Sequence, residues 1–230
     1  MVLGACSDRN RQAGSVPQGP SAPPSFWVWH RRSDLTEAER ATLGRADPAT
    51  AALVGGGARV VQYRDRAANA AERAERARMV FRTCRQLGAV FIVNDDIDLA
   101  DELMAHGVHL GEHDATVGAA RARLGPLAII GASCYDSVVN AQRAADAGAS
   151  YLAFGAFFPS PTKTNTRHAE PFLLRKARAL GLPLVAIGGI TPENAPELIA
   201  EGADAIAVAS GLLAGGDIEA AARRYAGLFP

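Results

Sequence analysis

The chain has few of the residues that mark disulfide-rich, metal-rich or membrane proteins. Its three cysteines, Cys6, Cys84 and Cys134, lie far apart and show no paired metal-binding spacing. This excludes a disulfide-stabilised scaffold and predicts free thiols in a reducing compartment, so we expect a cytoplasmic protein. No apolar run of about 18 residues occurs, which excludes a transmembrane helix.

The chain also lacks an excess of charge of either sign. Its 24 basic and 24 acidic side chains give a formal net charge of zero, so the composition indicates neither a nucleic-acid partner nor an anionic membrane. Any anion site must therefore come from a local concentration of basic groups. With 48% apolar and 21% charged residues, the composition is that of a globular protein with a sizeable core.

The N-terminal segment differs in composition from the rest. Residues 1–25 are rich in Gly, Pro, Ser, Arg and Gln and show no apolar period. Such a segment cannot bury enough apolar surface to order itself, so we expect a disordered tail. The remainder, 26–230, has the length of one α/β barrel and is predicted to be a single catalytic domain.

From residue 26 onward, short apolar runs alternate with amphipathic stretches of helical period. Continuous apolar runs are typical of buried parallel strands, and parallel pairing needs helical crossovers. The pattern predicts strands at 26–30, 59–63, 90–93, 107–110, 128–132, 150–154, 183–187 and 204–208, and helices at segments that include 68–87, 136–147, 170–180 and 193–201. Eight such units favour a (β/α)8 TIM barrel over an open doubly wound sheet, and no G-x-G-x-x-G follows the first strand.

Polar residues at the strand ends are the candidates for an active site, because barrel enzymes react there. The second strand ends in Gln62-Tyr-Arg-Asp-Arg66. Gln62 and Arg64 alternate along the strand, so both side chains should face the barrel mouth. Arg64 and Arg66 are suited to phosphate oxygens. A solvated turn is the alternative.

Carboxylates follow the third and fourth strands. Asn94, Asp95 and Asp96 come after the third, and Asp114 comes after the fourth. Asp95 and Asp114 could share Mg²⁺, which prefers one or two carboxylates together with water and phosphate oxygens. Asp96 is predicted to begin the following helix, and a helix cap is the alternative role for Asp114.

Histidine and serine also occur at these strand ends. His109 and His113 are four residues apart, as in a zinc pair, but a strand end with a glycine does not place both on one face, and no third ligand is apparent. Ser133 follows the fifth strand and can donate one hydrogen bond at the mouth. No G-x-S-x-G pattern surrounds it, so a nucleophilic role is not expected.

The last two strand ends predict a phosphate site. Gly188 and Gly189 follow the seventh strand, and Ala209 and Ser210 follow the eighth at the start of a helix. Glycines and a helix start at these positions form the usual phosphate site of such barrels, where backbone N–H groups approach the anion. Two tight turns without a ligand are the alternative.

The sixth strand leads into a loop, 156–164, with hydroxyls at Ser160 and Thr162 and an ammonium at Lys163. This set suits a dense anion such as a diphosphate, and a solvated surface loop is the alternative. The chain thus predicts two anion sites, a monophosphate cradle and a cationic site that bears a metal. No convincing general base or nucleophile lies between them.

Several motifs lie in barrel order between about Gln62 and Leu213. They are Gln62-Tyr-Arg-Asp-Arg66, Asn94-Asp95, Gly107-Val-His-Leu-Gly-Glu-His-Asp114, Gly131-Ala-Ser133, Phe154-Gly-Ala-Phe-Phe-Pro-Ser-Pro-Thr-Lys163 and Ala186-Ile-Gly-Gly-Ile-Thr-Pro-Glu-Asn194. With these motifs the chain resembles the thiamine phosphate synthase family. The resemblance implies coupling of 4-amino-2-methyl-5-hydroxymethylpyrimidine diphosphate to 4-methyl-5-(2-phosphoethyl)thiazole, with thiamine phosphate and diphosphate as products.

The resemblance also implies a mechanism and roles. Diphosphate leaves first, a pyrimidine-stabilised carbocation forms, and the thiazole nitrogen attacks it. Mg²⁺ on Asp95 and Asp114 would assist the leaving group. The implied catalytic residues are Lys163, Ser133 and Arg64, and the implied substrate-binding residues are Gln62, Arg64, Arg66, Asn94, Ser133, Ser160, Thr162, Lys163, Gly188, Gly189, Ala209 and Ser210. The partners would be these two small molecules, with no nucleic acid and no membrane, and a homo-oligomer is left open.

The chain departs from the family's usual pattern at several positions. Arg66 stands where the family often has lysine, and Ser160 stands at a frequent threonine position. Glu112 replaces a common glutamine and adds negative charge near the proposed metal. The run at 26–30 matches the usual first strand poorly.

Rival functions remain for the same barrel. A thiazole tautomerase-like paralogue would not need the arginines, carboxylates and lysine together, and would place a proton-shuttling histidine near Ser133, where Tyr135 stands instead. A non-catalytic thiamine-related sensor would bind phosphate without turnover. Another phosphate-binding barrel, such as an isomerase or aldolase, would need a catalytic Lys, Glu or Cys within a strand.

Overall fold

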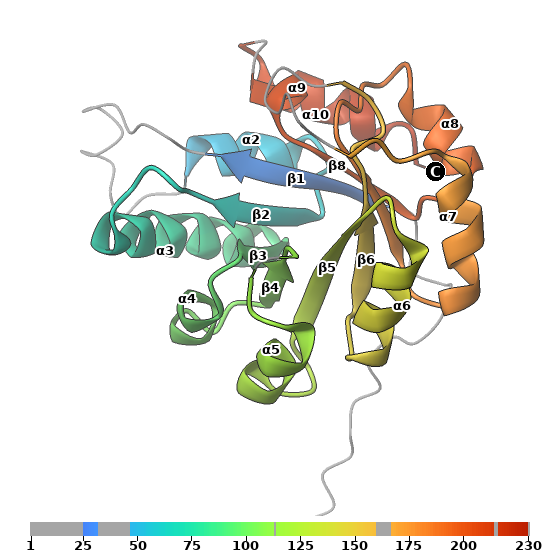
Figure 1. Cartoon of the computed structure of the whole chain (residues 1–230). Helices are drawn as coiled ribbons and strands as arrows, with labels where there is room; N and C mark the ends of the chain where they lie inside the picture. The colour runs from blue at the N-terminus through green and yellow to red at the C-terminus, as the bar shows by residue number, and fades with distance from the viewer. Residues whose placement is uncertain (1–24, 32–46, 113, 160–166, 214–215, 230) are drawn as a thin grey trace, which may run out of the picture.

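The computed structural model describes residues 25–31, 47–112, 114–159, 167–213 and 216–229. The predicted tail lies outside the described residues except for Ser25, which begins the first strand. In the described part of the chain, the strands form the centre and the helices pack around them (Figure 1).

The strands form one parallel sheet with a TIM-like order. They are β1 (Ser25–Arg31), β2 (Val60–Arg64), β3 (Val90–Asn94), β4 (Gly107–Leu110), β5 (Ile129–Tyr135), β6 (Tyr151–Phe154), β7 (Leu184–Ile187) and β8 (Ala205–Val208). Seven of them, β2 to β8, make a curled sheet in chain order, and β1 pairs in parallel with both β2 and β8. The predicted α/β class is confirmed, and the predicted strands match in position except at the end of β5.

The helices follow the strands as crossovers on the outside of the sheet. They are α2 (Pro48–Gly55), α3 (Ala70–Leu87), α4 (Ile97–Glu102), α5 (Val117–Leu124), α6 (Val138–Asp146), α7 (Phe172–Ala177), the 3₁₀ turn η1 (Arg178–Leu180), α8 (Ala195–Ala200), α9 (Ser210–Leu213) and α10 (Ile218–Ala226). The four helical segments singled out in the sequence correspond to α3, α6, α7 with η1, and α8. Asp96 caps α4 by accepting from the Leu99 N–H, as its position predicted.

The core has an outer and an inner part, because successive strand side chains point to opposite faces. Val61, Val93 and Ile130 are fully or almost fully buried in one cluster with Val80 of α3. The inner cluster includes Tyr151 and several small residues, Ala153, Ala205 and Ala207, which are joined by Val185. The small inner residues of β6 and β8 leave room near the barrel axis for the larger side chains described below.

The strand β5 is longer than predicted. It continues through Ser133, Cys134 and Tyr135, with a register shift between Ser133 and Tyr135. The prediction ended the strand where the apolar run ended. However, alternation places the polar Ser133 on the inner face and Cys134 in the buried cluster that includes Ala141 of α6.

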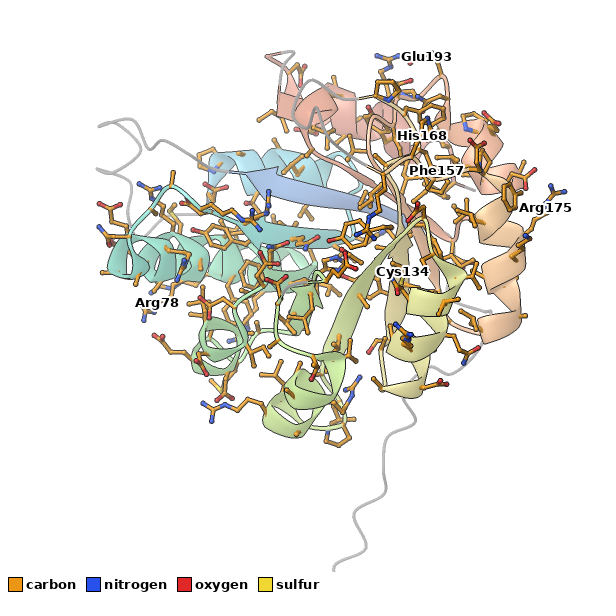
Figure 2. The ribbon with its side chains drawn as sticks, viewed as in Figure 1. Arg78, Cys134, Phe157, His168, Arg175 and Glu193 are labelled. Carbon is orange, nitrogen blue, oxygen red and sulfur yellow. The ribbon has the colours of Figure 1, made fainter. Side chains whose placement is uncertain are left out.

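The outer surface of the helical layer carries much of the charge. Figure 2 shows Arg175 projecting outward from α7, whereas Cys134 lies in the interior. None of the helices in the described ranges has the length and hydrophobicity that a membrane crossing requires.

Candidate active site

The loop after β2 is held by a buried aspartate. Asp65 is 5% exposed, and its Oδ2 accepts a hydrogen bond from Arg76 Nη1 of α3 at 2.8 Å. Its other oxygen, Oδ1, accepts from the N–H groups of Ala67 and Ala68, each at 3.2 Å. Asp65 is therefore an anchor that fixes the turn between the two arginines of the motif. No role was predicted for Asp65 from the sequence, although a single carboxylate between two arginines indicates a structural ion pair.

The two arginines of this loop line a cavity in the described part of the chain. The cavity has a volume of about 620 Å³, and its walls include Arg64, Arg66, Asn94 and Asp95. Arg66 is exposed, and its Nη2 lies 3.0 Å from Asp95 Oδ2. The cationic site expected from the second and third strand ends is therefore brought together in space.

A buried amide network lies next to this cavity. Gln62 is 4% exposed, and its Nε2 donates to Asn94 Oδ1 at 2.9 Å across β2 and β3. The bond orders both amides before any substrate arrives. Gln62 also lines a small internal cavity of about 10 Å³ together with His109 and Tyr151. Gln62 and Arg64 line different cavities, and the expectation that both face the barrel mouth stays a prediction.

Asp95 and Asp114 lie against one another although they are far apart in the chain. Asp95 has a φ of +66°, and its N–H donates to His109 O at 2.9 Å. Burial raises the pKa of Asp95, as does the hydrogen-bonded Asp114 carboxyl, whereas Arg66 acts to lower that pKa. Two carboxyl groups in contact repel one another when both are charged, which is one reason why the pKa of Asp95 is raised. A bound cation would offset that repulsion, so this position is suited to a cation.

The position of Asp114 depends on a glycine. Asp114 Oδ2 accepts from the Gly111 N–H at 2.7 Å, and a Cβ at Gly111 would lie 2.9 Å from the same oxygen. The helix α5 is capped instead by Thr116, whose side chain accepts from Ala119 N–H. The alternative role of Asp114 as the cap of that helix is therefore wrong.

The carboxylate pair fits Mg²⁺ better than a closed zinc site. Among the described residues, no group of three or more His, Cys, Asp or Glu side chains could hold a metal ion. Two carboxylates are enough for Mg²⁺, which keeps waters and takes phosphate oxygens as its other ligands. His113, the second member of the proposed zinc pair, lies outside the described residues, and His109 is engaged elsewhere.

His109 contacts Ser133 and Tyr151, and neither contact was predicted from the sequence. Its Nε2 lies 2.8 Å from Ser133 Oγ, and its Nδ1 lies 2.9 Å from Tyr151 Oη. Burial lowers the pKa of His109 to about 4, so the ring is neutral at physiological pH. The expectation that no histidine stands near Ser133 is wrong, because the neighbour comes from another strand, β4.

The glycines after β7 are constrained by the segment that follows β6. Gly188 and Gly189 have φ values of +94° and +64°. A Cβ at Gly188 would lie 2.4 Å from Ala156 Cβ, and a Cβ at Gly189 would lie 2.5 Å from Phe158 O. The Phe158 N–H donates to Gly188 O at 3.1 Å. Both glycines therefore allow the β6 segment to pack on the end of β7.

The other half of the predicted cradle lies after β8. Ala209 follows β8, and Ser210 begins the short helix α9, so the expected helix start is present. Asn194 Nδ2 donates to Gly189 O at 3.1 Å, and Tyr225 Oη donates to Ile190 O at 3.2 Å. The two strand ends thus have the glycine turn and the short extra helix that TIM-barrel phosphate sites share.

The three loop residues Ser160, Thr162 and Lys163 lie outside the described residues. The chain on either side of them is held together, because the Ala156 N–H donates to Arg167 O at 3.2 Å and the Ala169 N–H donates to Ala156 O at 2.9 Å. Arg167 Nη2 also bonds Glu112 Oε2 at 2.7 Å, and its guanidinium lies 5.0 Å from the centre of the Tyr135 ring. Ala156 and Arg167, which flank the loop in the chain, are therefore direct neighbours.

Comparisons with known proteins agree with this geometry. Residues 36–212 match the family described as thiamine monophosphate synthase. The chain is 55% identical over 165 residues to the thiamine-phosphate synthase of Xanthomonas campestris pv. campestris (strain 8004), covering 72% of this chain and 80% of that protein. It is 45% identical over 210 residues to the thiamine-phosphate synthase of Methylobacillus flagellatus, covering 91% and 98%. The solved structure of a thiamine phosphate pyrophosphorylase from Pyrococcus furiosus superposes with a TM-score of 0.76 at 30% identity, covering 89% and 95%.

Proposed function

The chain belongs to the thiamine monophosphate synthase family, and from this premise we propose how its site carries out the thiamine-phosphate synthase reaction. The substrates are 4-amino-2-methyl-5-hydroxymethylpyrimidine diphosphate and 4-methyl-5-(2-phosphoethyl)thiazole. The products are thiamine phosphate and diphosphate. The observation that carries the proposal is the convergence of Arg66, Asp95 and Asp114 from three strand ends, where Arg66 and Asp95 line one cavity.

The first chemical step is loss of diphosphate. The bond between the pyrimidine methylene carbon and the diphosphate oxygen breaks, and its electron pair leaves on that oxygen. Arg64 and Arg66 stabilise the charge that develops there, and Lys163 adds a third cation from the β6–α7 loop. Mg²⁺, when bound by Asp95 and Asp114, supplies further positive charge to the departing oxygens.

The second step forms the carbon–nitrogen bond of the product. The lone pair of the thiazole nitrogen attacks the methylene carbocation, so no protein base or nucleophile is needed. The protein contributes by holding the two substrates in line while charge separates.

The pyrimidine and thiazole ends occupy different parts of the mouth. Gln62 and Asn94 are already bonded to one another, so their free donors and acceptors are fixed for the pyrimidine ring, and Ser133 adds a hydroxyl beside them. The thiazole phosphate binds the cradle of Gly188, Gly189, Ala209 and Ser210 through backbone N–H groups. Ser160 and Thr162 supply hydroxyls to the diphosphate.

Further parts of the proposal concern the molecule as a whole. We propose that eight βα units complete a closed (β/α)8 barrel across residues 26–230, which the pairing of β1 with both β2 and β8 supports.

We also propose that the enzyme works in the cytoplasm, in keeping with its buried free thiols at Cys84 and Cys134.

The rival functions have less support. The matches named above are to synthases, and none of them favours a thiazole tautomerase or a sensor. His109 beside Ser133 removes one argument against the tautomerase. However, that reaction gives no reason for Arg66, Asp95 and Asp114 to converge.

A coupled assay on the full chain tests the proposal. Diphosphate should be released only when both substrates and Mg²⁺ are present, with thiamine phosphate formed in equal amount. Lys163→Ala should lower kcat by at least about 100-fold, as expected for a group that stabilises developing charge. The matched control is Lys176→Ala on α7, whose ammonium lies over the Phe172 ring at 4.6 Å and which should keep full activity. Failure to form thiamine phosphate with both substrates and Mg²⁺ present would contradict the proposal.

A further inference from the structure

Tyr151 and His109 form a buried polar pair that the reaction above does not use. Both residues are 3% exposed, and their rings are stacked with centroids 5.5 Å apart and an interplanar angle of 22°. Ser133, the third member, is only partly buried. The chain Tyr151–His109–Ser133 therefore runs from the closed interior to the open mouth of the barrel.

The strand register explains how Tyr151 reaches His109. His109 of β4 pairs with Gly131 of β5, and Gly131 pairs with Tyr151 of β6, so the three lie at one level. A Cβ at Gly131 would lie 2.0 Å from Tyr151 Cζ. The tyrosine ring thus occupies the space that a side chain on β5 would take, and it crosses that strand to the histidine.

The surroundings prevent substrate from touching the inner two residues. The internal cavity that Gln62, His109 and Tyr151 line has a volume of about 10 Å³, which is at the lower limit for a single water. A pyrimidine ring cannot enter it. Among the described side-chain contacts of this pair, the one that leads toward the open mouth is with Ser133, whose Oγ is 2.8 Å from His109 Nε2.

A neutral imidazole donates from one nitrogen and accepts at the other, so the tautomer of His109 sets the direction of every bond in the chain. A phenol is the stronger donor and an imidazole nitrogen the stronger acceptor, which favours donation from Tyr151 Oη to Nδ1. Nε2–H must then donate to Ser133 Oγ. The remaining hydrogen of Ser133 is left to point into the mouth.

We propose that Tyr151 and His109 are positioning residues that hold the Ser133 hydroxyl as a hydrogen-bond donor toward the substrate. The inference rests on the proposed function for the identity of that substrate. It assigns Ser133 to a hydrogen-bond acceptor of the substrate, such as a departing phosphate oxygen, which gains negative charge as the diphosphate leaves. In the opposite tautomer Ser133 would donate to Nε2 and could offer the substrate only lone pairs.

The tautomer itself can be measured without any activity. Nitrogen-15 NMR of the full chain, labelled at histidine, should show His109 protonated at Nε2 and unprotonated at Nδ1. Loss of that signal in His109→Gln assigns it among the five histidines. Protonation at Nδ1 would overturn the proposal. Because no substrate is present, this result stands even if the synthase assay fails.

Kinetics then test whether the chain acts through Ser133. Tyr151→Phe keeps the ring and should lower kcat about fivefold to tenfold, the loss expected for one hydrogen bond, with KM for either substrate changed less than twofold. Combining it with Ser133→Ala should give a kcat within twofold of Ser133→Ala alone. His109→Gln, which keeps a donor near the position of Nε2, should be more active than His109→Ala.

A matched control separates positioning from general loss of stability. Ser150→Ala removes a hydroxyl from the residue that directly precedes Tyr151, where Ser150 Oγ accepts from the Ile130 N–H and from Arg121 Nη2. It should lower Tm without changing kcat. If Tyr151→Phe also lowers only Tm, or if its effect multiplies with that of Ser133→Ala, the positioning role is refuted.

Discussion

Glu112 and Arg167 form an ion pair across the barrel mouth, with Nη2 and Oε2 2.7 Å apart. Glu112 belongs to the β4–α5 loop and Arg167 to the loop that follows β6. Their side chains are 36% and 48% exposed, so solvent weakens the attraction. The pair nonetheless neutralises a carboxylate that the sequence alone placed as an extra charge near the metal.

Glu112→Gln should therefore have little effect. The family often has glutamine there, and loss of an exposed pair should change the free energy of unfolding by less than about 1 kcal/mol. We expect kcat and the Mg²⁺ concentration for half-maximal rate to stay within about twofold. A tenfold loss of Mg²⁺ affinity would show that the Glu112 charge does reach the metal.

Asp65→Ala should destabilise the fold strongly. It leaves the Arg76 guanidinium, which is 8% exposed, without its 2.8 Å partner, and such losses cost about 3–5 kcal/mol. Urea unfolding measures the change. Glu72→Gln is the matched control, because Glu72 is the exposed partner of the same arginine at 3.7 Å, and it should cost less than about 0.5 kcal/mol. Equal losses in the two variants would contradict the anchoring role of Asp65.

Asp95→Asn should raise the Mg²⁺ requirement at least about tenfold, because it removes one of two carboxylate ligands. Chelation of Mg²⁺ should abolish turnover in the parent enzyme, and added Mg²⁺ should restore it. Since the pKa of Asp95 is raised by burial and by Asp114, apparent Mg²⁺ affinity should fall as the pH falls, starting at a higher pH than for an ordinary carboxyl. Asp101→Asn on α4, which removes a carboxylate paired with Arg123, is the control and should leave the requirement unchanged.

Gly188→Ala should cost more than Gly181→Ala. Both glycines have positive φ, +94° and +70°, so alanine is strained at each by about 1 kcal/mol. Only at Gly188 does the new Cβ meet another atom, Ala156 Cβ at 2.4 Å, whereas nothing lies within 4 Å at Gly181. We expect a larger fall in Tm and a higher KM for the thiazole phosphate in Gly188→Ala alone. Equal effects would mean that the backbone angle, and not the packing of the β6 segment, requires glycine.

The thiols of Cys84 and Cys134 should be unreactive in the folded protein. Both are fully buried, and burial raises the pKa of each to about 12. A Cys6→Ser variant should therefore give almost no reaction with a thiol reagent at pH 8, and two thiols after unfolding in urea. Because the unfolded thiols ionise at lower pH than the folded ones, stability should fall as the pH rises above about 9. Rapid labelling of the folded variant would contradict this burial.

The sequence predicted where the strands lie in the chain more accurately than the residues at which they end. Continuous apolar runs mark buried parallel strands clearly, so the predicted positions match β2, β3 and β4 within a residue. The fifth strand was cut short because Ser133 interrupts the run. A polar residue that faces the barrel interior has the same local pattern as a residue in a loop, and only the pairing with β6 distinguishes them.

Residues of the site were identified individually but not always in their contacts. Arg66, Asp95 and Asp114 were expected to act together, and the structure places them in contact. The partnership of His109 with Ser133 was missed because the residues are 24 positions apart and come from different strands. Spacing along one strand carries no information about a neighbour on the next.

By itself, the amino-acid sequence determined the alternation of strands and helices, the chemical types gathered at the strand ends, and the family. These depend on hydrophobic period and on local motifs, which the chain carries without reference to its fold. Only the tertiary structure decided that Glu112 is paired, that Asp65 is buried under Arg76, and that Tyr151 crosses Gly131 to reach His109. Such contacts arise from the register of neighbouring strands and from the absence of a side chain at one position, and both are properties of the assembled barrel.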